Sequence, residues 1–251
     1  MSIFVRYPYK NEEEWLSLRK YGGSDAAAII GQNPYRTNLE LWQELVGLRE
    51  RQFVDNKFTR YGKKAEAPLR MLAQLHFKDF EDENGIDFAK ITHSDEVLAR
   101  VDKPYLTASL DGEIEILKDF EFTSYWKSYY TKDSDVIEIK PIQLKKGMKG
   151  VLEVKTTDVL SSMHKENWNN QIPMNYYIQT LHYLNVTGYD FVVLMAQLKF
   201  TDKNKVITYE NRFYGFLRDD RKEDLIYLET EMDKFHYYVD NKIEPPLKIN
   251  I

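Results

Sequence analysis

The spacing of hydrophobic residues predicts a largely helical first third of the chain. An acidic run follows Asn11 and precedes Trp15. This order is typical of a short helix, because acidic side chains favour the positive end of the helix dipole. The segment AAAII predicts a second short helix, with Ser24 and Asp25 as candidate caps and Gly31 at its end.

Two further helices are expected before the hydrophobic period changes. Thr37 and Glu40 have the spacing of a capping box, in which each side chain bonds the backbone N–H of the other residue, just before LWQEL. A longer helix is expected over residues 58–76, with Pro68 as a candidate kink.

The middle of the chain alternates with a period of two, which predicts strands. A helix is then expected from Pro173 to about Val186, ended by Gly188, and the last helix from Asp219 to Asn241. This order predicts an α/β fold, with a single domain over residues 1–251. The expected strands are 88–92, 96–101, 105–117, 150–156, FVVLMAQLKF and VITYENRFYGF.

Composition narrows the class of protein. A chain of 251 residues with 43% hydrophobic positions can bury one substantial core. Cysteine is absent, which excludes disulfides and thiolate metal sites. The N-terminus turns acidic early and no apolar run approaches the roughly 20 residues that span a bilayer, so we expect a soluble, cytoplasmic protein without a signal peptide. The net charge of −5 does not settle whether the partner is a polyanion.

The strand VLEVKTT carries the first candidate chemistry. Glu153 and Lys155 lie two residues apart, so both side chains point to one face of a strand. Asp111 precedes Gly112 at what we interpret as a strand end, and its carboxylate could share a hard divalent cation with Glu153. Lys155 would then lie beside the cation, where it could orient a water or offset charge on a phosphate. An ordinary Glu–Lys pair on an exposed strand face would leave the same trace in the sequence.

Six segments together make the pattern more specific. They are WLSLRKYGGSDAAAIIG, NPYRTNLELWQELVG, YGKKAEAPLRMLA, TASLDG, VLEVKTT and IPMNYYIQTLHYLNVTG, in this order. In these segments the chain resembles the YqaJ-like viral recombinase family, relatives of the bacteriophage lambda exonuclease, from about Trp15 to Gly188. The resemblance implies the PD-(D/E)XK nuclease core, a central mixed sheet flanked by helices.

The resemblance also implies roles for individual residues. It places Asp111 and Glu153 as metal ligands and Lys155 as the catalytic lysine, with Glu66 supporting the metal through water. The polar residues that it places around the DNA 5′-phosphate and the scissile site are Arg19, Ser24, Ser109 and Gln179.

Two features depart from the family pattern. Arg19 lies five residues before Ser24, whereas seven is usual, so Lys20 or Arg36 are alternative phosphate readers. The long separation of Asp111 and Glu153 predicts an inserted β-hairpin around residues 113–150, rich in aromatics and lysine, that could contact DNA or a neighbouring subunit.

The implied activity is a Mg²⁺-dependent 5′-to-3′ double-strand DNA exonuclease, with Mn²⁺ able to substitute. It would release mononucleotides and leave a 3′ single strand for a single-strand annealing protein. Relatives form trimeric rings, and a phage or prophage origin in a bacterial host is expected. The alternatives are a PD-(D/E)XK endonuclease of restriction or repair type and a non-catalytic DNA-end-binding protein.

Overall fold

A five-stranded mixed sheet forms the centre of the computed structural model, which describes residues 2–51, 55–125 and 141–248. Its strand order is β10-β9-β8-β5-β2. Strands β8 and β9 run parallel and the other neighbours run antiparallel, which confirms the predicted mixed sheet. The strands are β2 (Ala89–Thr92), β5 (Gly112–Ile116), β8 (Lys149–Asp158), β9 (Phe191–Thr201) and β10 (Ile207–Leu217).

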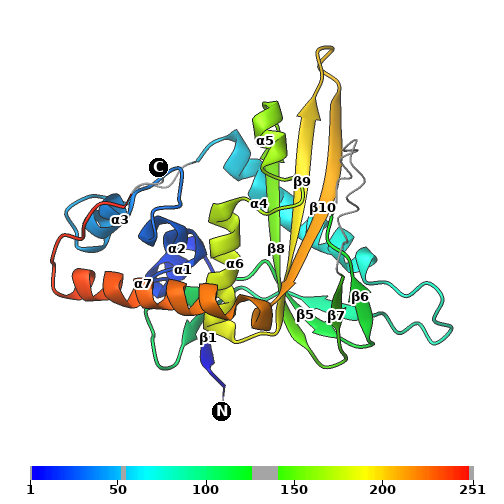
Figure 1. Ribbon diagram of the computed structural model, residues 1–251, viewed down its shortest axis with the longest axis horizontal. Coiled ribbons are helices and arrows are strands. Elements are labelled where there is room, and N and C mark those ends of the chain that lie inside the picture. Colours follow the sequence, from blue (N-terminus) through cyan, green and yellow to red (C-terminus); the bar gives the residue numbers. More distant parts are fainter. Residues whose placement is uncertain (1, 52–54, 126–140, 249–251) are drawn as a thin grey trace, which may run out of the picture.

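Helices cover both faces of this sheet (Figure 1). Alternate residues of β8 point to opposite faces, so Val151 packs with α6 (Met174–Thr187) while Leu152 packs with α4 (Lys57–His76). The helix α4 starts one residue before the predicted position and contains Pro68. Gly188 ends α6, as predicted, and it takes the left-handed conformation.

A second sheet explains why the predicted strand 105–117 is wrong as one element. The segment is divided into β4 (Thr107–Ala108), which pairs with β3 (Glu96–Arg100), and β5, which joins the central sheet. The order of the second sheet is β1-β3-β4, where β1 (Phe4–Pro8) was not predicted. The chain therefore changes sheets at residues 109–111, and this change brings Asp111 to the start of β5, beside β8 in the central sheet.

The N-terminal helices pack beside α6 and the C-terminal helix. The predicted capping box of Thr37 and Glu40 is confirmed at the start of α3. The N-cap of α2 is Gly22, so Ser24 is wrong as a predicted cap, whereas Asp25 does cap the helix as its third residue, because its carboxylate accepts the Gly22 N–H. The last helix begins at residue 222, after the 3₁₀ helix η1 (Arg218–Arg221). The helices of this layer are α1 (Glu12–Leu18), α2 (Gly23–Ile29), α3 (Asn38–Leu45) and α7 (Lys222–Asp240).

The predicted insertion is a hairpin with narrower bounds. Strands β6 (Phe120–Phe122) and β7 (Ile142–Leu144) pair antiparallel, while residues 113–116 and 149–150 belong to the central sheet. Phe122 and Leu144 are buried against α4 because both are large apolar side chains on the inner face of the hairpin. Residues 126–140, the centre of the predicted insertion, lie outside the described part of the chain.

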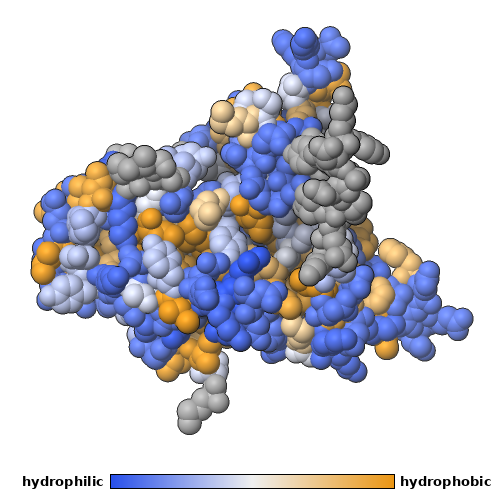
Figure 2. All heavy atoms as spheres, in the orientation of Figure 1, coloured by the Kyte–Doolittle hydropathy of each residue, from blue (hydrophilic) through white to orange (hydrophobic). Residues whose placement is uncertain are grey.

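The remaining elements leave a mostly hydrophilic surface. Strands β9 and β10 extend as a long hairpin beyond the helices, and the short helix α5 (Ser162–Glu166), which was not predicted, lies beside them (Figure 1). Figure 2 shows hydrophobic residues gathered near the middle of the same face. Within the described ranges, none of the helices is long and apolar enough to cross a membrane.

Candidate functional site

Asp111 and Glu153 meet because their strands are paired. Gly112 of β5 faces Leu152 of antiparallel β8, so the next position along the register sets Asp111 opposite Glu153. The Asp111 Oδ2 atom accepts the backbone N–H of Val154 over 2.8 Å, which fixes the carboxylate at this end of β5. The structure thus brings together the two acids that the sequence pattern paired.

Glu153 is buried with polar partners on one oxygen only. Its side chain is 1% exposed, and Oε1 lies 2.5 Å from Lys155 Nζ and 2.8 Å from the Gln179 amide nitrogen. Its second oxygen, Oε2, is buried and has no hydrogen-bond partner among the described residues. A buried carboxylate oxygen without a partner is costly, so this atom is available to a cation or a water.

The acids make one another harder to ionise. Burial and the Asp111 carboxylate raise the pKa of Glu153 to about 8, against the lowering effect of Lys155. Burial and Asp111 likewise raise the pKa of Glu66 to about 7. Burial also raises the pKa of Asp111, which Lys155 and the Val154 N–H partly offset. Lys155, Arg70 and Lys63 offset these effects only in part, because the pKa values of the three carboxyl groups remain raised. The site therefore favours an additional positive charge.

The residues fit a divalent cation that keeps much of its water. No cluster of three or more His, Cys, Asp or Glu side chains close enough to form a metal site occurs in residues 2–51, 55–125 and 141–248. Asp111 and Glu153 offer two carboxylates, one with the free Oε2 oxygen, and Glu66 is close enough for its charge to act on both. Mg²⁺ is commonly held by one or two carboxylates together with waters and substrate phosphates. These residues therefore fit Mg²⁺, which keeps several waters, better than an ion whose ligands all come from the protein.

A cavity of about 560 Å³ is lined by most of the eight predicted site residues. Six of them line it: Arg19, Ser24, Glu66, Ser109, Asp111 and Gln179. Glu153 lines neither this cavity nor a second one of about 760 Å³, which Lys155 lines. Lys63 and Glu66 line both cavities, so the two cavities adjoin. Buried Glu153 joins them through its contacts with Gln179, which lines the first cavity, and with Lys155, which lines the second.

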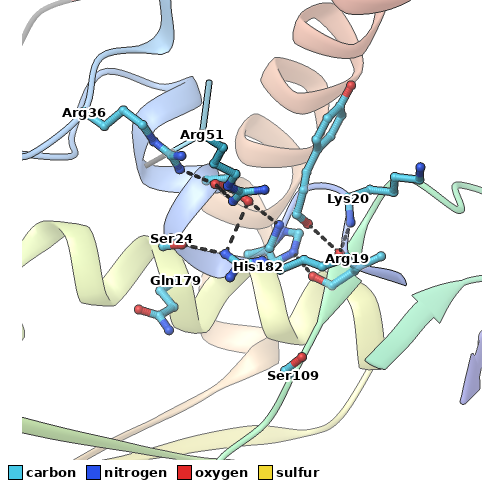
Figure 3. Close-up of polar contacts among 12 residues, drawn as sticks. Arg19, Lys20, Ser24, Arg36, Arg51, Ser109, Gln179 and His182 are labelled. Atoms are coloured by element: carbon cyan, nitrogen blue, oxygen red, sulfur yellow. Dashed lines mark hydrogen bonds and ion pairs between the residues drawn. The ribbon is translucent and has the colours of Figure 1, made fainter. Parts of the chain in front are cut away.

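Arg19 reaches Ser24 in spite of the shortened spacing. Its Nη2 atom lies 2.7 Å from Ser24 Oγ, because the chain turns at Gly22 between α1 and α2. The side chain of Lys20 points away from Arg19 and Ser24 (Figure 3). Arg36 instead bonds the carboxylates of Asp25 and Glu44. Neither alternative lines the cavity.

Three residues at the site were not singled out for it by the sequence. Trp15 donates its indole N–H to Ser109 Oγ over 2.8 Å, and Tyr183 OH accepts from Gln179 over 2.7 Å. Asp25 binds Arg19, although it was predicted only as a helix cap. The spacing of Gln179 and Tyr183 on one helical face was a usable signal, whereas His182 on that face turns instead to the Thr107 carbonyl.

Comparison with solved structures gives the same fold. The alkaline exonuclease LHK-Exo from Laribacter hongkongensis matches with a TM-score of 0.54 at 17% identity, over 93% of this chain and 95% of that one. LHK-Exo in complex with dAMP matches with a TM-score of 0.54 at 18% identity, over 92% and 94% of the two chains. The central mixed sheet flanked by helices is thus the PD-(D/E)XK fold of that exonuclease.

Comparison of sequences identifies the family. YqaJ of Bacillus subtilis (strain 168) is 25% identical over 209 residues, which are 80% of this chain and 52% of YqaJ. The chain therefore spans about half the length of this curated relative. The model of the YqaJ-like viral recombinase domain matches residues 14–190, and the chain accordingly belongs to the YqaJ-like viral recombinase domain family.

Proposed function

We propose that this chain is a Mg²⁺-dependent nuclease that digests double-stranded DNA from its ends in the 5′-to-3′ direction. The observation that carries the proposal is the meeting of Asp111, Glu153 and Lys155 at the paired ends of β5 and β8, where Asp111 lines the same cavity as Arg19 and Ser24. Carboxylate oxygens that could hold a metal, an ammonium and a guanidinium that could bind a phosphate therefore belong to one site.

The acids and the lysine would have different roles in cleavage. Asp111 and Glu153 would hold Mg²⁺, or Mn²⁺ in its place, with Glu66 acting through water. The bound ion would supply Lewis-acid activation of the water that attacks the phosphodiester. Gln179 holds the Glu153 carboxylate in place through Oε1. Lys155 would offset the negative charge that develops on the phosphate during attack.

Recognition of a DNA end would use the first cavity. A terminal phosphate carries more negative charge than an internal phosphodiester, and a guanidinium donates two parallel hydrogen bonds to it. Arg19 supplies the guanidinium, and Ser24, Ser109 and Gln179 supply neutral polar groups that do not compete with the acids for the metal. This set would favour a 5′-phosphorylated end.

The comparisons support nuclease chemistry and a role in recombination. One match is an alkaline exonuclease, also seen in complex with the mononucleotide dAMP, and the family is that of viral recombinases. We infer that this chain releases mononucleotides and leaves a 3′ single strand for a single-strand annealing protein. A trimeric ring around the DNA, as in relatives, and a phage or prophage origin complete the proposal.

Digestion of end-labelled linear and circular duplex DNA, each with and without Mg²⁺, tests the proposal. We expect the linear 5′-phosphorylated duplex to release mononucleotides only when Mg²⁺ is present. Circular DNA should stay intact in both conditions. Cleavage of circles would show an endonuclease instead. Binding of linear ends without cleavage in Mg²⁺ or Mn²⁺ would show a non-catalytic end-binding protein.

A further inference from the structure

Asp25 is a buried carboxylate shared by three arginines from separate parts of the chain. Its side chain is 0% exposed, and Arg19 and Arg51 each lie 3.3 Å from one of its oxygens. Arg36 also bonds Asp25, and the Gly22 N–H donates to it over 2.9 Å. Figure 3 shows the three arginines arriving from different directions. The carboxylate therefore fixes the end of α1 and the two segments that flank α3 around one point.

Asp25 stays ionised in this position. Burial by itself would raise its pKa, but Arg19, Arg36 and Arg51 together bring the pKa below its usual value. An ionised acceptor gives stronger hydrogen bonds to a guanidinium than a neutral one. Asp25 thus keeps the negative charge that binds the three arginines. Of these three, Arg19 lines the cavity.

The guanidinium of Arg19 is confined on its other sides as well. It lies 5.1 Å from the centre of the Trp15 ring, and the Trp15 indole is itself tied to Ser109. A Cβ atom at residue 22 would lie 2.5 Å from Arg19 Nε, so the absence of a side chain at Gly22 makes room for the guanidinium. Ser24 Oγ accepts from the same Nη2 atom that faces Asp25. Such a side chain gives up little conformational freedom when it binds an anion.

We propose that Asp25 is a positioning residue for recognition of the DNA end: it holds Arg19 over the cavity, with Gly22 and Trp15 confining the guanidinium. The inference rests on the proposed nuclease function and adds a determinant of end preference. It also makes the segments around Arg36 and Arg51 part of end recognition, since both arginines bind the anchor that orients Arg19.

Two variants separate positioning from general stability. Asp25→Asn keeps the size of the side chain and removes the anchor charge. Gly22→Ala keeps every charge and displaces the guanidinium by sterics alone; its φ of −91° is open to alanine. Arg49→Gln is the matched control, because Arg49 forms an exposed ion pair with Glu40 on α3 and does not line the cavity.

The measurement is the ratio of single-turnover digestion rates on 5′-phosphorylated and 5′-hydroxyl linear duplexes, beside thermal unfolding of each variant. We expect both variants to lower this ratio about tenfold, because a charge-assisted contact is weakened, with little change on the hydroxyl end. Arg49→Gln should keep the wild-type ratio. If Asp25→Asn does not fold, Gly22→Ala decides.

The outcomes separate this inference from the proposed function. A wild-type protein that digests no duplex overturns the proposed function. A wild-type protein that digests both ends equally, or a Gly22→Ala variant that keeps the full phosphate preference, overturns the role of Asp25 while the nuclease assignment stands. Lowered stability with an unchanged ratio would show that the Asp25 cluster is structural only.

Discussion

The side-chain amide of Gln179 on α6 donates to Glu153 Oε1 on β8 over 2.8 Å. Gln179 also lines the cavity that holds Arg19 and Ser24. One residue therefore contacts the buried acid and the surface proposed to receive the DNA end. This contact sets the proposed metal site and the proposed phosphate site at a fixed separation, as the proposed release of mononucleotides would require.

The two acids should be essential for cleavage and dispensable for folding. Asp111→Asn and Glu153→Gln each remove the carboxylate of a proposed metal ligand with little change in size, and we expect a loss of roughly 10²–10³-fold in single-turnover rate. Calorimetric titration should show weaker Mn²⁺ binding, whereas binding to duplex DNA should persist. Glu115→Gln, on the exposed side of the same strand β5, is the control. Full activity of either site variant would refute the metal assignment.

Lys155 should affect the rate more than metal affinity. Its ammonium pairs with Glu153 and faces the second cavity, so Lys155→Met should slow cleavage at saturating Mg²⁺ by about 10²-fold. Mn²⁺ affinity should change less than the rate, because the ammonium acts on the attacking water and the phosphate rather than on the ion. Lys149→Met, at the exposed start of β8, provides the comparison. A normal rate with weak metal binding would assign Lys155 a structural role.

The local sequence pattern was enough to predict much of the fold and the shared face of Glu153 and Lys155. The period of two in VLEVKTT places Glu153 and Lys155 on one face whatever the rest of the chain does, and the Thr37–Glu40 capping box is likewise local. The change of sheet at residues 109–111 was missed because apolar alternation continues through it. Only the pairing of β4 with β3 and of β5 with β8 reveals the change.

Contacts between distant residues set the parts of the site that were missed. Trp15 and Ser109 are 94 positions apart, and Arg51 lies 26 positions after Asp25. An aspartate after Gly22, Gly23 and Ser24 is a good candidate cap by local rules. The role of Asp25 in positioning Arg19 depends also on Arg36 and Arg51, and only the folded chain brings these two arginines next to Asp25.

The Asp25 cluster predicts a definite dependence of stability on pH. Because the folded-state pKa lies below the ordinary value of 3.8, ionised Asp25 stabilises the fold at every pH above that value. This contribution is lost as the pH falls through the lower folded-state pKa. Asp25→Asn should reduce the free energy of unfolding by about 3 kcal/mol at pH 6, as expected when one partner of a buried ion pair is removed. Urea titrations from pH 6 to pH 2 should show the gap between variant and wild type closing below about pH 4; a constant gap would contradict the prediction.

Arg19 should account for the preference for a phosphorylated end. Removing the 5′-phosphate from the substrate and changing Arg19 to alanine delete the same interaction, so their effects on rate should not add. The test is a double cycle in which wild type and Arg19→Ala each digest phosphorylated and hydroxyl-ended duplex under single-turnover conditions. We expect each single change to slow digestion by a similar factor, and the combination to be little slower than either one. Lys20→Ala should behave as wild type, because the Lys20 side chain points away from the Arg19 group. If Arg19→Ala still prefers the phosphorylated end as strongly as wild type, Arg19 is not the reader, and Arg36 becomes the next residue to change.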